Sequence, residues 1–94
     1  MKRRSSAAKL AKTLGVPKRR ALQAVLKAQL IAAVVREMDR TALTHAVLAS
    51  RSGLPRSAVT GILSGSLQRV TLDRVLRLVE AAGLEAEIRI RRAA

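Results

Sequence analysis

The sequence predicts a mainly α-helical domain of four to five helices, with one C-terminal β-strand that pairs across a dimer. Three observations lead to this fold class. Apolar residues recur every three or four positions over residues 18–83, which is the period of amphipathic helices. Glycines and capping threonines stand where these stretches end and begin. From residue 84 onward the period changes to strict alternation, which is typical of a half-exposed strand.

Composition favours a polyanionic partner. The 94 residues form one small domain. It contains 19 Lys and Arg but 6 Asp and Glu, for a net charge of +13. No apolar run approaches the ~20 residues that span a bilayer, so we expect no membrane partner. The chain lacks cysteine and therefore disulfides and thiolate metal sites. It also lacks aromatic rings on which single-stranded bases stack, so duplex DNA is favoured over RNA or single strands.

Residues 1–17 are predicted to be a basic arm with a short helix that Gly15 closes. Eight of the first 20 residues are Lys or Arg, and none is acidic. The arm is expected to be disordered and attracted to phosphates, or to enter a minor groove. A basic, serine-containing start without acids is also typical of an organelle transit peptide, which stays an alternative.

Residues 18–83 are predicted to be the helical domain. Because no Gly or Pro occurs between Pro17 and Gly53, one long helix is expected from Lys18 to about Arg40. It carries two apolar stripes on different sides. The C-terminal stripe is expected in the core: Leu30, Ile31, Val34, Val35 and Met38. The N-terminal stripe (Leu22, Val25, Leu26) then needs another partner, either the short N-terminal helix or a second subunit.

The stretch from Leu43 to Gly65 predicts two short helices joined by a tight turn. Thr44 can cap the first helix, Gly53 can supply the positive φ of the turn, and Pro55 presets φ for the second helix. The apolar residues expected to face the core are Leu48, Ala49, Val59, Ile62 and Leu63. The outward face of the second helix is predicted to carry Arg56, Ser57, Thr60 and Gly61.

A last helix is expected after Thr71, which is a plausible N-cap, and it should end at Gly83. Its predicted buried stripe is Leu72, Val75, Leu76 and Val79. Residues 84–94 follow as a dimerisation strand and tail, with Leu84, Ala86, Ile88 and Ile90 alternating with charged residues. Antiparallel self-pairing at Ile88 would place each glutamate opposite an arginine. The alternative is a frayed tail lying against its own domain.

The helix pair resembles the helix-turn-helix of lambda-repressor-like, Xre/Cro-type DNA-binding domains. The matching residues are Leu43-Thr44, Leu48-Ala49, Gly53, Val59 and Ile62-Leu63-Ser64-Gly65, without a gap over 23 positions. A looser likeness extends from about Ala21 to Ile90. The chain departs from the family pattern at Val47, which removes the capping box, and at Ser52, where an apolar residue is usual. The alternative interpretation is an ordinary helical hairpin within a core.

The resemblance implies that the second helix enters the major groove. Its base-contacting positions correspond to Arg56, Ser57, Thr60 and Gly61, with guanine expected beneath Arg56. The implied phosphate-contacting residues are Thr44, His45, Arg51, Pro55, Ser64, Gln68 and Arg69. For Arg51 and Gln68, a solvated surface role is an equal alternative.

The predicted function is that of a cytoplasmic, nucleoid-associated homodimer that represses transcription from a palindromic operator. Two alternatives stay open: an antitoxin that binds a toxin and represses its own operon, and a nucleoid protein that coats DNA without sequence preference. No catalytic residue, cofactor or metal is expected, because His45 is the single histidine and no acidic or cysteine cluster accompanies it.

Overall fold

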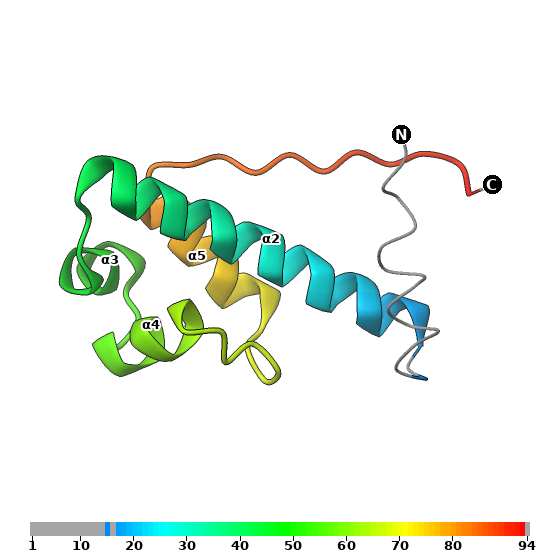
Figure 1. Ribbon diagram of the computed structural model, residues 1–94, viewed down its shortest axis with the longest axis horizontal. Helices are drawn as coiled ribbons and strands as arrows, with labels where there is room; N and C mark the ends of the chain where they lie inside the picture. Colours follow the sequence, from blue (N-terminus) through cyan, green and yellow to red (C-terminus); the bar gives the residue numbers. More distant parts are fainter. Residues whose placement is uncertain (1–14, 16, 94) are drawn as a thin grey trace.

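The computed structural model describes Gly15 and residues 17–93. In this part of the chain four α-helices form and no β-strand does. They are α2 (Lys18–Thr41), α3 (His45–Ser52), α4 (Arg56–Leu63) and α5 (Leu72–Ala81). The long helix α2 packs along α5, and α3 lies against both α4 and α5 (Figure 1). The short helix predicted before Gly15 lies outside the described residues.

Side-chain caps begin two of the helices where the sequence predicts them. The Thr44 hydroxyl oxygen accepts a hydrogen bond of 3.1 Å from the Val47 N–H at the start of α3. Thr71 Oγ1 accepts one of 3.2 Å from the Arg74 N–H at the start of α5. Gly53 adopts φ +75° after α3, as expected for the turn. The predicted caps and the predicted turn are therefore confirmed.

The end of α2 is built differently from the other helix ends. Ala42 follows the helix in the left-handed region with φ +58°, a conformation that costs an L-residue about 1–2 kcal/mol. The Thr41 hydroxyl, on the last residue of the helix, donates a 2.7 Å hydrogen bond to the Glu37 carbonyl oxygen one turn earlier. Arg40 forms an ion pair with the Glu37 carboxylate at 2.7 Å, and this contact lowers the pKa of Glu37.

The core draws on every helix. Its largest fully buried side chains are Val34 from α2, Leu48 from α3, Val59 from α4, and Val75 and Leu78 from α5. Ile31 and Ile62 are also buried there, and Leu30, Met38, Ala49 and Leu63 pack against the cluster at its edge. The predicted core faces of α2, α3 and α4 are thus confirmed, apart from Val35, which is exposed.

The predicted stripe of α5 needs a correction. Leu76 is 37% exposed, whereas Leu78 is completely buried. At about 100° per residue, Leu78 and Val79 lie on either side of Val75, while Leu76 lies a quarter-turn away. The face that packs on α2 and α3 is therefore centred on Val75.

The N-terminal half of α2 leaves apolar surface exposed. Leu22 is 46% exposed, and Val25 and Leu26 are half-buried. Ala21, which was not part of the predicted stripe, is buried. The predicted stripe is therefore partly exposed, and the partner expected for it, either the short N-terminal helix or a second subunit, stays a prediction.

The single chain forms no strand at the predicted residues 84–90, and pairing of this segment across a dimer stays a prediction. The Gly83 N–H donates to the Glu80 carbonyl at 2.9 Å, and the Leu84 N–H donates to the Val79 carbonyl at 3.0 Å. With Gly83 at φ +80°, these bonds form a Schellman motif that ends α5, so Leu84 packs on the core as part of a helix cap. Residues 85–93 then run exposed and extended without a β-ladder, with Ile88 79% and Ile90 91% exposed (Figure 1).

Candidate nucleic-acid interface

The outward face of α4 presents the four residues that the resemblance assigns to base contacts. Arg56, Ser57 and Thr60 are exposed, and Gly61 is half-exposed. Val59 and Ile62 are buried in the core, which fixes the rotation of the helix. The outward face therefore combines one long cation, two short hydroxyl side chains and a glycine on a helix that cannot turn.

Neither packing nor backbone conformation requires a glycine at position 61. A Cβ built there meets no atom within 4 Å, and its φ does not lie in the left-handed region. A glycine inside a helix costs about 1 kcal/mol relative to alanine. Because neither packing nor backbone conformation requires it, its absent side chain serves as open space on the outer face of α4.

His45 and Thr60 connect the start of α3 to the outer face of α4. His45 Nδ1 lies 2.9 Å from Thr60 Oγ1, which is a hydrogen bond between the two helices of the motif. A mid-helix threonine often bonds a carbonyl of the preceding turn, but the Thr60 hydroxyl is directed to the imidazole instead. The resemblance assigns both residues to the interface, but the sequence does not indicate that they bond each other.

The other predicted phosphate contacts lie at helix ends and in the loop after α4. Thr44 and Pro55 are exposed N-cap residues of α3 and α4. Ser64 is exposed after α4, and its hydroxyl donates to the Gly61 carbonyl at 2.9 Å. Gln68 and Arg69 are exposed in the turn that leads to α5. These residues are accessible to a ligand, so their predicted contacts to phosphate stay predictions.

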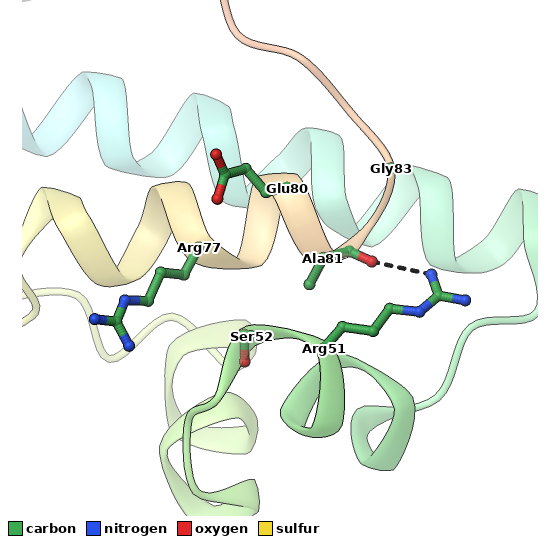
Figure 2. Close-up of a pocket in the computed structure, with 6 residues that line it drawn as sticks. All are labelled: Arg51, Ser52, Arg77, Glu80, Ala81 and Gly83. Carbon is green, nitrogen blue, oxygen red and sulfur yellow. Dashed lines mark hydrogen bonds between the residues drawn. The ribbon is translucent and has the colours of Figure 1, made fainter.

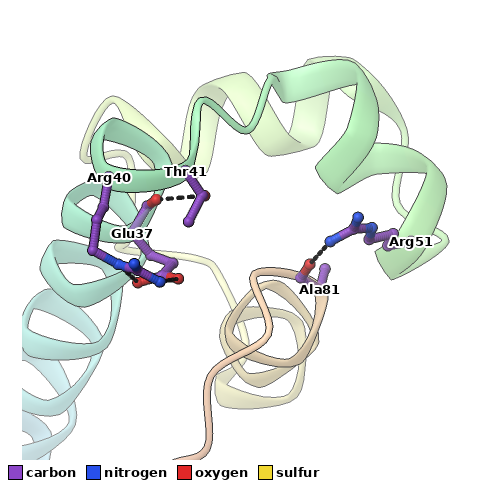
Figure 3. A network of polar contacts seen from close by, with 5 residues as sticks. All are labelled: Glu37, Arg40, Thr41, Arg51 and Ala81. Atoms are coloured by element: carbon purple, nitrogen blue, oxygen red, sulfur yellow. Dashed lines mark hydrogen bonds and ion pairs between the residues drawn. The ribbon is translucent and has the colours of Figure 1, made fainter.

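Arg51 has a partner within the protein. Its guanidinium donates a 3.1 Å hydrogen bond to the Ala81 carbonyl at the C-terminal end of α5 (Figure 3). A cation at this position satisfies an unpaired helix carbonyl and complements the negative end of the helix dipole. Arg51 therefore joins α3 to α5, a role that the sequence did not indicate.

Ser52, the departure from the family pattern, contributes to the turn. Its hydroxyl accepts a hydrogen bond of 3.2 Å from the Leu54 N–H and lies 3.4 Å from the Ala49 carbonyl. A serine in place of the usual apolar residue predicts weaker packing at this position. The structure adds that the hydroxyl satisfies a backbone donor in the turn between α3 and α4.

An open pocket of about 410 Å³ lies between the C-terminal ends of α3 and α5 (Figure 2). Its lining consists of Arg51, Ser52, Arg77, Glu80, Ala81 and Gly83. Arg51 is bound to Ala81, and Arg77 is paired with Asp73 at 3.1 Å. Since no base-contacting candidate lines it, the pocket is separate from the α4 face. Within the described residues, no group of three His, Cys, Asp or Glu could hold a metal ion.

Residues 10–91 match a protein family described as a helix-turn-helix domain. The chain belongs to this helix-turn-helix family. No curated protein and no solved structure matches the chain significantly.

Membership of the helix-turn-helix family supports DNA as the partner of this protein. In such motifs the second helix lies in the major groove, and in this chain α4 is the second helix of the pair. Its exposed face is therefore the candidate interface. No helix within the described ranges is long and apolar enough to cross a bilayer.

Replacement of Arg51 by alanine should lower the free energy of unfolding by about 1 kcal/mol, because the Ala81 carbonyl loses a charged donor. It should leave the salt dependence of DNA binding unchanged, since the guanidinium is engaged within the protein. Denaturant unfolding and binding titrations at several salt concentrations measure the two effects. Arg69→Ala is the matched control, expected to reduce the slope of log K against log salt by about 1. A reduced slope in Arg51→Ala would instead identify Arg51 as a phosphate contact.

Proposed function

We propose that this protein is a sequence-specific regulator of transcription that binds double-stranded DNA as a homodimer and acts as a repressor. The observation that carries the proposal is the outer face of α4, where Arg56, Ser57 and Thr60 are exposed around the open space at Gly61. The net charge of +13 supports attraction to DNA phosphates. The proposed role is binding rather than catalysis, and the proposed location is the cytoplasm, at the nucleoid.

The dimensions of α4 suit the major groove. An α-helix with its side chains is about 10–12 Å in diameter, and the groove is about 12 Å wide. Arg56 is the first residue of the helix, and N-terminal residues of recognition helices contact base edges. The Arg56 guanidinium can donate two parallel hydrogen bonds to O6 and N7 of guanine, which makes a G·C pair its preferred site.

A dimer would double this small interface. The extended residues 85–91 can pair antiparallel with their own copy around Ile88, placing Glu85 opposite Arg91 and Glu87 opposite Arg89. The exposed Ile88 and Ile90 would then gain apolar contact. Two copies of α4 about 34 Å apart would bind half-sites one helical turn apart on a palindromic operator.

Replacement of Arg56 by alanine should relax the preference for one G·C pair in each half-site, with a loss of about 1–3 kcal/mol of discrimination. Selection of bound duplexes from a randomised pool, followed by titration of the selected operator, measures this change. Arg36→Ala removes the same charge from the exposed face of α2 and is the matched control. Alanine at Lys2, Arg3 and Arg4 should instead weaken binding to every duplex and flatten the salt dependence. An unchanged preference in Arg56→Ala would contradict the assignment of α4 to the groove.

Replacement of Gly61 by alanine should change stability and binding in opposite directions. The free energy of unfolding should rise by up to about 1 kcal/mol, because alanine favours the helix and its Cβ meets no atom. Operator binding should weaken, because the methyl group occupies the space left for the DNA. Thermal unfolding and operator titration of the same preparation measure both quantities. If binding stays at the wild-type level, DNA does not approach α4 at Gly61.

Replacement of Ile88 by lysine should convert the dimer to a monomer, because two lysines would face each other at the twofold axis. Sedimentation equilibrium measures the mass, and operator binding should weaken in parallel. Ala93→Lys adds the same charge beyond the pairing segment and should leave the dimer intact. A dimeric Ile88→Lys protein would exclude pairing through this segment.

Antitoxin activity is the second candidate, and the exposed Leu22 on the N-terminal half of α2 favours it. With half-buried Val25 and Leu26, this side chain offers apolar surface to a protein partner. Purification of a partner at fixed stoichiometry, lost on Leu22→Lys, would support this function. A protein that binds random duplex as tightly as any selected site would instead be a nucleoid protein that coats DNA.

A further inference from the structure

The hydrogen bond between His45 and Thr60 connects the first residue of α3 to the outer face of α4. Thr60 stands on the outer face of α4, and its hydroxyl lies 2.9 Å from His45 Nδ1. A hydroxyl has one proton and two lone pairs, so a fixed bond on one side determines what it offers on the other. The state of the imidazole therefore sets the hydrogen-bonding character of Thr60 toward the DNA.

The two ring nitrogens of a neutral imidazole have opposite roles: one is a donor and the other an acceptor. Within the described residues, His45 Nε2 has no protein hydrogen-bond partner. His45 is the first residue of α3, where helix-turn-helix proteins meet the phosphate backbone. Phosphate oxygens only accept hydrogen bonds, so a phosphate at Nε2 selects the tautomer that carries its proton there. Nδ1 is then the acceptor, and Thr60 must donate to it.

We propose that His45 is a specificity-determining positioning residue, which makes Thr60 a hydrogen-bond acceptor toward the base beneath it. An acceptor in the major groove pairs with an amino group, which adenine carries at N6 and cytosine at N4. His45 thereby couples a phosphate contact, which carries no sequence information, to selection of adenine or cytosine at one position. The inference rests on the proposed DNA-binding function.

Two substitutions at His45 separate the roles of its two ring nitrogens. In His45→Asn, the side-chain carbonyl oxygen takes the place of Nδ1 and can still accept from Thr60, but the donor at Nε2 is lost. In His45→Gln, the amide N–H takes the place of Nε2, and the acceptor at Nδ1 is lost. Thr60→Val removes the hydroxyl and keeps the shape of the side chain, whereas Thr60→Ser keeps the hydroxyl. Thermal unfolding by circular dichroism establishes that each variant is folded.

The experiment selects bound duplexes from a randomised pool at mildly alkaline pH. The wild-type protein and Thr60→Ser should prefer adenine or cytosine at one position by about tenfold. His45→Gln and Thr60→Val should lose that preference and keep the preference beneath Arg56. His45→Asn should keep both preferences and bind all duplexes about tenfold more weakly.

Four outcomes would overturn the proposal. An unchanged affinity after the amino group of the selected base pair is removed, as in purine for adenine, would mean that the hydroxyl donates to the DNA. Retention of the preference in His45→Gln or Thr60→Val would mean that the bond does not control base selection. If Arg56→Ala relaxes its own base pair while the His45 and Thr60 variants change nothing, only this inference fails. If the wild-type protein selects no sequence at all, the proposed function fails with it.

Discussion

The structure depends on one apolar core to which all four described helices contribute. Val34, Leu48, Val59, Val75 and Leu78 are fully buried in the same cluster, although α3 and α4 have only eight residues each. Helices this short are unstable alone, so packing rather than propensity holds them. Each such aliphatic side chain contributes about 1.5–3 kcal/mol. Because the chain has no aromatic residue, many small contacts replace a few large ones.

That shared core determines what α4 can present. Val59 and Ile62 are anchored inside, so Thr60 and Gly61 between them must face outward. Polar bonds then refine the geometry from outside the core. Ser52 fixes the turn, Arg51 ties α3 to the end of α5, and His45 reaches across to Thr60. All three residues belong to α3, which therefore supports the outer face of α4.

The sequence predicted the elements that local chemistry specifies. Thr44 and Thr71 are caps whose bonds lie within three residues, and the Gly53 turn needs only a positive φ. It did not predict the contact of Arg51 with Ala81, because that bond joins positions 30 residues apart and leaves no periodic signal. The alternating pattern misled at Leu84 for a related reason. Alternation indicates what a segment can do beside a partner strand, whereas the backbone of Leu84 belongs to the cap of α5.

In the proposed function, the composition of the α4 face limits how it can distinguish DNA sequences. Apart from Arg56, its outward residues are two short hydroxyl side chains and a glycine, so differences in size contribute little. Discrimination by a hydroxyl requires that its proton be held in one direction, because a free rotor satisfies donors and acceptors equally. Thr60 is held by the imidazole of His45, and no bond to a described residue fixes the hydroxyl of Ser57. On a surface this small, the support that orients a side chain matters as much as the side chain itself.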